Sequence, residues 1–122
     1  MAKILIVDDD FEIVSLLRDF LQELGHSVDF AGDPVDGMTK ARAMEPDLII
    51  LDFHLPKTTG AHLFESLRRN QKTRLTPILF MSGEAEPEEI LREVSDSQGS
   101  RFMAKPVHLD DFKKAIEEML HG

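Results

Sequence analysis

Three short apolar runs stand out along the chain, and each holds four consecutive residues without a polar side chain. They span residues 4–7, 48–51 and 78–81. Uninterrupted runs of this length are typical of strands that are buried on both faces, as in a parallel sheet. Two weaker strands are predicted at residues 27–31, where Val28 and Phe30 alternate with polar residues, and at residues 101–104.

Five stretches with helical spacing of apolar residues lie between and after these strands. They span residues 10–24, 34–44, 61–71, 87–94 and 109–120. Local signals agree with two of these helices, because Asp33 is a suitable N-cap before Pro34 and Gly25 follows the first helix as a stop signal. Strand and helix therefore alternate five times, which predicts a doubly wound α/β fold with a parallel sheet and right-handed crossovers.

Composition narrows the possible functions. A chain of 122 residues without a linker, repeat or low-complexity tract is expected to form a single domain, residues 1–122. The formal net charge of −9 argues against direct nucleic-acid binding, and the absence of cysteine excludes disulfides, thiolate catalysis and thiolate metal sites. No apolar run approaches the length of a membrane span and the first residues are too few for a secretory signal, so we expect a cytoplasmic protein.

Polar residues follow the apolar runs at the points where the predicted strands end. Asp8 and Asp9 come after the first strand, Asp52 after the third, Ser82 after the fourth and Lys105 after the fifth. In a doubly wound sheet the functional site lies outside the carboxyl ends of the strands, where the strand order reverses. These side chains are therefore expected to converge on one patch although they are far apart in the sequence.

Three carboxylates in a small space repel one another unless a cation is present. Oxygen ligands in an open site suit Mg²⁺, so Asp8, Asp9 and Asp52 form a candidate magnesium site. A carboxylate oxygen left free of the metal can attack a phosphoryl group and form an acyl phosphate, and Asp52 at the end of the most apolar strand is the best candidate nucleophile. Lys105 would then act as a point charge on phosphate oxygens, and Ser82 would offer a hydroxyl.

Each of these residues also has a simpler explanation when it is taken alone. An acid at the start of a helix complements the helix dipole. For Asp10 this explanation is as good as a role in the site. A lysine near the end of a strand is usually solvated, and Ser82 also suits a turn or a helix cap. Lys105 precedes Pro106, and a bond of this type has two accessible isomers.

The combination of these features resembles the receiver domain of response regulators, the chemotaxis-protein type of two-component signalling, over essentially the whole chain. The resemblance implies a flavodoxin-like, five-stranded parallel sheet of order 2-1-3-4-5 with helices on both faces. It implies that Asp52 accepts a phosphoryl group from the phosphohistidine of a sensor histidine kinase or histidine phosphotransfer protein. The domain would then signal to a downstream target or output domain, and would not be an enzyme beyond its own phosphotransfer and autodephosphorylation.

The resemblance also assigns roles around the metal and the phosphoryl group. Asp8 and Asp9 would organise Mg²⁺, with Asp9 as the more direct ligand, and a further ligand would be the backbone carbonyl of His54. Ser82 and Lys105 match the switch hydroxyl and the phosphate-contacting lysine of the family.

Phe102 matches the aromatic residue of the family whose rotamer follows the switch. Plain core packing at the edge of the sheet is the alternative for this residue.

The first predicted helix has a candidate docking surface beside its core face. A helical wheel of residues 10–24 places four residues on the face that packs on the sheet: Val14, Leu17, Leu21 and Leu24. Leu16 lies on the far side, with Ile13 and Phe20 between the two. In related receivers this helix lies against the phosphodonor domain, which favours partner docking by these three residues over harmless surface exposure.

Two other functions compete with a receiver. A haloacid-dehalogenase-type phosphohydrolase would use Asp8 and Asp10 as its Asp-x-Asp motif, with Asp8 as the nucleophile, but it would leave Asp52 without a role. A flavodoxin-like electron carrier would need a phosphate-binding loop rich in Ser, Thr or Gly, where this chain has three acids that repel phosphate. A purely structural interaction module has no need of the acidic residues.

Overall fold

The computed structural model describes residues 2–55, 58–83 and 100–121, with the backbone alone at residues 54 and 58–61. The predicted helix at residues 87–94 lies outside this part of the chain.

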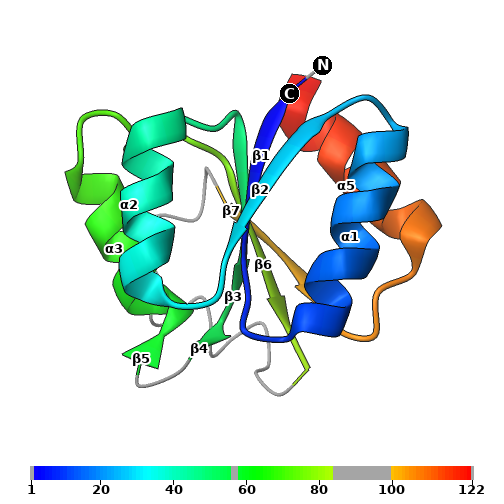
Figure 1. The fold of residues 1–122 in the computed structure, drawn as a ribbon, viewed down its shortest axis with the longest axis horizontal. Helices are drawn as coiled ribbons and strands as arrows, with labels where there is room; N and C mark the ends of the chain where they lie inside the picture. Colours follow the sequence, from blue (N-terminus) through cyan, green and yellow to red (C-terminus); the bar gives the residue numbers. More distant parts are fainter. Residues whose placement is uncertain (1, 56–57, 84–99, 122) are drawn as a thin grey trace.

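Five strands form one parallel sheet in the order β2-β1-β3-β6-β7. Counted without the two short strands that follow β3, this is the predicted order 2-1-3-4-5. The strands are β1 (Lys3–Val7), β2 (Ser27–Ala31), β3 (Leu48–Asp52), β6 (Ile78–Ser82) and β7 (Ser100–Ala104). The helices are α1 (Phe11–Glu23), α2 (Pro34–Met44), α3 (Gly60–Arg69) and α5 (Leu109–His121). Figure 1 shows α1 and α5 on one side of the sheet and α2 and α3 on the other.

The sheet is buried on both faces, as the uninterrupted apolar runs predicted. In β1, Leu5 and Val7 belong to the core under α2 and α3, whereas Ile4 and Ile6 belong to the core under α1 and α5. Fully burying one such side chain contributes about 1.5–3 kcal/mol. The helices complete the two cores with Ala41, Leu63, Phe64 and Leu67 on one face and Val14, Leu17, Leu21, Phe112 and Ile116 on the other.

The start of α1 gives Asp10 a structural role. Its side chain is the N-cap of the helix and accepts hydrogen bonds from the backbone N–H groups of Glu12 and Ile13, at 3.0 and 3.4 Å. Asp10 therefore lies at the start of the helix, where dipole complementation was expected, and in addition it caps the helix with its side chain, which was not predicted.

The prediction for the other end of α1 was wrong at one residue. Leu24 was expected on the buried face, but it is 37% exposed. The helix ends at Glu23 and Leu24 is its C-cap, so the chain leaves the helical path there and turns at Gly25, whose φ is 94°.

The ends of α2 are set by its sequence. As predicted, Asp33 is the N-cap and accepts a hydrogen bond from the backbone N–H of Asp36 at 2.8 Å, with Pro34 as the first helical residue. At the other end, Glu45 adopts the left-handed conformation with φ 46° and ψ 66°. A glycine usually occupies such a position, because any Cβ raises the energy of this conformation.

Two short antiparallel strands follow β3, in the stretch that the sequence presented only as a link to the next helix. They are β4 (His54–Leu55) and β5 (Thr58–Thr59), which pair His54 with Thr59 and Leu55 with Thr58. This ladder fixes the backbone between Asp52 and α3.

Candidate functional site

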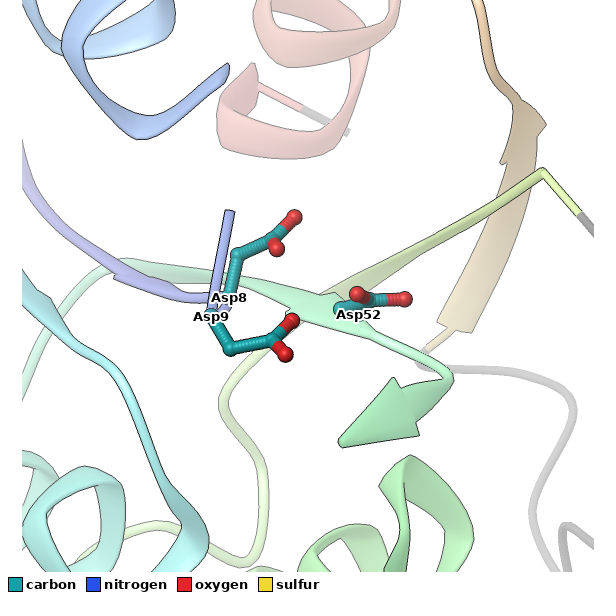
Figure 2. A group of neighbouring side chains, drawn as sticks. All are labelled: Asp8, Asp9 and Asp52. Atoms are coloured by element: carbon teal, nitrogen blue, oxygen red, sulfur yellow. The ribbon is translucent and has the colours of Figure 1, made fainter. Parts of the chain in front are cut away.

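The carboxyl edge of the sheet brings three predicted acids together. Val7 and Leu51 are paired in the register of β1 and β3, so Asp8 and Asp52, the residues that follow them, lie side by side. Figure 2 shows the carboxylates of Asp8, Asp9 and Asp52 at this edge, and one oxygen of each lies within 4.8 Å of the others. The predicted convergence of these acids is therefore observed.

Asp8 is buried and is held by several hydrogen bonds. Its backbone N–H donates to the carbonyl of Ala31 at 3.0 Å, which ties the end of β1 to β2. Its Oδ1 accepts from the backbone N–H of Asp10 at 2.9 Å, and its Oδ2 accepts from Nζ of Lys105 at 3.0 Å. Asp52 is also buried, whereas Asp9 is exposed, so the carboxylate cluster is open to solvent on the side of Asp9.

Lys105 reaches the acids from the residue directly after β7. Its Nζ lies 3.0 Å from Oδ2 of Asp8 and 3.5 Å from Oδ2 of Asp52. Burial lowers the pKa of Lys105, but the hydrogen bond to Asp8 and the negative charges of Asp8 and Asp52 outweigh it, so the pKa is raised above its ordinary value. Lys105 therefore keeps its charge at neutral pH and offsets part of the repulsion between the acids.

The backbone fixes the position of Lys105 as well. Its N–H donates to the carbonyl of Ser82 at 3.0 Å, which ties it to the end of β6. Ser82 is the last residue of β6, is buried and pairs with Ala104 in the register of β6 and β7. The structure thus places Ser82 and Lys105 at the same edge of the sheet as the acids.

Phe102 lies in β7 opposite Phe80 of β6 and is half-buried. It packs against the core under α2 and α3, which is the packing role considered for it.

Two roles stay predictions. They are the role of Phe102 as a switch residue and the use of the His54 carbonyl as a metal ligand. The backbone of His54 lies in β4, two residues beyond Asp52.

The three predicted docking residues of α1 differ in exposure. Leu16 is 49% exposed, whereas Ile13 and Phe20 are half-buried and pack against the core under α1 and α5. The ring of Phe20 lies 6.1 Å from that of Phe112. These contacts leave Leu16 as the most accessible of the three.

Phe11, a large exposed residue beside the acids, was missed in the sequence. It is the first residue of α1, is 65% exposed and packs edge-to-face on Phe30, with ring centroids 6.1 Å apart. An aromatic residue directly after a helix-capping acid is the sequence signal that would have identified Phe11, because the first turn of the helix has little core to cover the ring.

His26, which directly precedes β2, has a structural role. His26 is half-buried, and its Nδ1 accepts a hydrogen bond from the backbone N–H of Ala2 at 3.1 Å. Burial, the positive amino terminus and the positive charge of His121 lower the pKa of His26. His26 therefore links the start of β1 to the loop before β2.

Comparison with known proteins agrees with the fold. A family model of the response regulator receiver domain matches residues 4–117. PhoP, the alkaline phosphatase synthesis transcriptional regulatory protein of Bacillus subtilis, is 38% identical over 119 residues, which are 97% of this chain and 48% of PhoP. Protein PilH of Pseudomonas aeruginosa is 30% identical over 123 residues and is matched over 100% of both chains. This chain therefore spans about half the length of PhoP and the whole length of PilH.

A solved structure extends the likeness to three dimensions. The chemotaxis protein CheY4 of Vibrio cholerae has a TM-score of 0.90 at 30% sequence identity, covering 98% of this chain and 99% of that one. The fold and the acidic site define a flavodoxin-like α/β domain whose charged groups meet at the switch point of the sheet. The family match extends over nearly the whole chain, and the chain belongs to the response regulator receiver domains.

The protein is thus a receiver of two-component signalling, as its sequence indicated, and the phosphohydrolase and electron-carrier alternatives are set aside. Receivers take signals from histidine kinases and act on output domains or partners, and they are generally not enzymes. Magnesium binding is typical of the family, and the three carboxylates with an open side fit a hard cation that prefers oxygen ligands. None of the helices in the described part of the chain is long and apolar enough to cross a membrane.

Proposed function

We propose that Asp52 accepts a phosphoryl group from a phosphohistidine of a histidine kinase or histidine phosphotransfer protein. A carboxylate oxygen of Asp52 attacks the phosphorus, the bond between phosphorus and the imidazole nitrogen breaks, and its electron pair stays on the imidazole. The product is an acyl phosphate on Asp52. The observation that carries this proposal is the meeting of Asp52 with Asp8, Asp9 and Lys105 at one edge of the sheet.

The donor set supports a magnesium site formed by Asp8, Asp9, Asp52 and the backbone carbonyl of His54. When bound, Mg²⁺ supplies positive charge that offsets the repulsion between the phosphoryl oxygens and the carboxylates. Asp8 is held for this role by its hydrogen bonds to Asp10 and Lys105. Asp9 is exposed, so its side of the cluster is accessible to water and to a metal ion.

Lys105 and Ser82 are proposed to bind the transferred phosphoryl group. Nζ of Lys105 already lies between two carboxylates, so it needs only a short displacement to contact an oxygen of a phosphoryl group on Asp52. The hydroxyl of Ser82 would donate a hydrogen bond to another oxygen. If these contacts are stronger in one of two conformations, phosphorylation shifts the population toward it, with Phe102 following the switch.

Docking of the phosphodonor is proposed on the α1 side of the site. Leu16 presents the most exposed apolar side chain of the three predicted residues, and Ile13 and Phe20 present their uncovered edges beside it. Phosphorylation is then read by a downstream target or by an output domain.

Phosphorylation by a small phosphodonor tests the proposed acceptor. Acetyl phosphate with Mg²⁺ is expected to add one phosphoryl group, measured by intact mass, and Asp52→Asn should abolish the addition because it removes the nucleophile. Asp8→Asn should slow the addition without preventing it. Asp47→Asn is the matched control, since it makes the same chemical change in an exposed acid at the opposite edge of the sheet. Modification of Asp8 in place of Asp52, located by peptide mapping, would refute the proposal.

A further inference from the structure

An open groove runs between α2 and α3, away from the acidic cluster. The two helices lie on the same face of the sheet in Figure 1, and the cavity between them measures about 1050 Å³. The α2 wall is a stripe at positions i, i+3, i+4 and i+7 of the helix, and the α3 wall includes Leu63 and Ser66. The α2 stripe consists of Val35, Met38, Thr39 and Arg42.

Part of the groove lining is apolar, although the groove lies on the surface. Val35 is 78% exposed, and it lines the same groove as the half-buried Met38 and the buried Leu63. Thr39 and Ser66 are short, so they let another backbone approach closely. A groove lined by apolar and short side chains suits an amphipathic helix, which anchors its apolar residues at helical spacing.

The opposite face of α2 packs closely on the sheet. A Cβ added at Gly37 would lie 3.1 Å from Val7 and 3.3 Å from Leu63, so this face of the helix is in close contact with β1 and α3. Val35 lies on the exposed side of the same helix.

The charges of the groove are separated along α2. Asp33 and Asp36 stand at the start of the helix, and Arg42 stands two turns further on. Asp36 is paired with Lys40 at 3.3 Å, whereas Arg42 forms no ion pair with any residue that the structure describes. The groove thus has an acidic end and a basic end.

We propose that this groove binds an amphipathic helix of a partner protein, lying antiparallel to α2. Helices favour acids in their first turn and bases in their last turn. In the antiparallel orientation, the acidic first turn of the partner lies at Arg42 and its basic last turn lies at Asp33 and Asp36. Apolar side chains at helical spacing then cover Val35 and Met38. The proposed surface does not depend on the phosphoryl chemistry of Asp52.

A synthetic peptide tests the surface directly on the full unphosphorylated chain. The probe is an amphipathic helix with glutamates in its first turn, leucines at i, i+3, i+4 and i+7, and lysines in its last turn. Its titration into the ¹⁵N-labelled protein should shift the amides of residues 35–42 and 62–66 and leave those of α1 unchanged. Absence of saturable shifts there, or larger shifts in α1, would overturn the proposal.

Two matched variants identify the apolar contact. Val35→Asn should weaken binding of the peptide about tenfold, because it removes the apolar anchor contact without adding a charge. Leu75→Asn introduces the same amide at an apolar residue of similar exposure, 82%, outside the groove, and should leave the affinity unchanged. Equal effects of the two substitutions would show non-specific binding and overturn the proposal. Spectra without peptide verify that both variants are folded.

Charge exchange tests the orientation of the partner helix. Arg42→Glu should weaken binding of the probe about fivefold, and a second peptide with lysines in its first turn and the same lysines in its last turn should recover that loss on the variant. If the second peptide binds the unmodified protein as tightly as the first, the antiparallel orientation is wrong.

Discussion

Both ends of the sheet gather titratable side chains, but these side chains have different partners at the two ends. At the amino edge the side chains of His26, Asp47 and Lys3 each bond to the backbone: His26 to Ala2, Asp47 to the N–H of Lys3, and Nζ of Lys3 to the carbonyl of Met44. At the carboxyl edge the carboxylates of Asp8, Asp9 and Asp52 lie close to one another, and Asp8 and Asp52 share Lys105 as a partner.

At the amino edge these side chains stabilise the fold, whereas at the carboxyl edge like charges repel one another. Each of these three contacts at the amino edge pairs one polar side chain with one backbone group, which stabilises the ends of strands and loops. At the carboxyl edge, buried like charges oppose folding unless a cation offsets them, and that conflict is what makes the site responsive to a metal ion or a phosphoryl group. Substitutions at the two edges should therefore act differently on stability and on function.

The largest expected effect is loss of the cation at the carboxyl edge. Lys105→Met leaves the buried acids Asp8 and Asp52 without their shared ion pair, and should lower the free energy of unfolding by about 2–3 kcal/mol, less than for a fully buried pair because Lys105 is partly exposed. The raised pKa of Lys105 means that its contribution is fully present below pH 10.5, its ordinary pKa, and is lost as the pH rises through its folded-state value.

Urea denaturation at pH 7 without Mg²⁺ measures this loss. The control is Lys113→Met, which removes an exposed lysine of α5. A loss no larger than that of the control would mean that Lys105 does not offset the repulsion between the acids.

The second effect comes from relief of repulsion at the same edge. Asp9→Ala removes one of three neighbouring carboxylates and should raise the free energy of unfolding without metal by about 1 kcal/mol, the scale for charges near water. The same substitution should weaken the stabilisation by Mg²⁺ that the unmodified protein shows, because binding to the folded state alone stabilises it. Melting curves with MgCl₂, and with NaCl at equal ionic strength as the control, test both expectations. A melting temperature of the unmodified protein that does not respond to Mg²⁺ would contradict the proposed site.

The residues of the carboxyl edge were predictable from the sequence because they stand at the ends of the predicted strands. Asp8, Asp52 and Ser82 each stand at the end of an apolar run, and parallel strands bring their carboxyl ends to one edge. Lys105 could be placed at this edge by the same reasoning, although its 3.0 Å contact with Asp8 depends on side-chain packing that no local pattern contains.

The features that were missed depend on contacts between distant residues or on a single residue at an element's end. The acceptor role of His26 toward Ala2 spans 24 residues of sequence. The exposure of Leu24 follows from a helix that ends one residue earlier than the apolar spacing indicates. Strands of two residues, such as β4 and β5, are too short to show an alternating pattern.

A smaller effect is expected from protonation at the amino edge. The pKa of His26 is lowered in the folded protein by burial, the amino terminus and His121, and Asp47 lines the same cavity. Since the unfolded state binds the proton more readily, the stability that neutral His26 contributes is present above pH 6.5 and is lost as the pH falls through its folded-state pKa. His26→Gln removes this titration but keeps an acceptor for the N–H of Ala2.

Denaturation curves between pH 7.5 and pH 5, values chosen to span the ordinary histidine range, measure this contribution. The unmodified protein should lose stability relative to His26→Gln as the pH falls. His108→Gln makes the same substitution at an exposed histidine and is measured in parallel as the control. A constant difference between the unmodified protein and His26→Gln over this range would refute the role of His26.

The smallest effect is a gain in stability at the amino edge that leaves the site untouched. Glu45 holds a left-handed backbone conformation at the end of α2, which costs a residue with a Cβ about 1 kcal/mol. Glycine removes that cost but gains backbone freedom in the unfolded chain, so Glu45→Gly should raise the free energy of unfolding by only about 0.5 kcal/mol.

Because Glu45 lies at the opposite edge from Asp52, the rate of phosphorylation of Glu45→Gly by acetyl phosphate should not change. Asp9→Ala also stabilises the protein in the absence of metal, but it should slow that reaction, so the pair of variants separates stability from function. Slower phosphorylation of Glu45→Gly would show that the two edges are coupled.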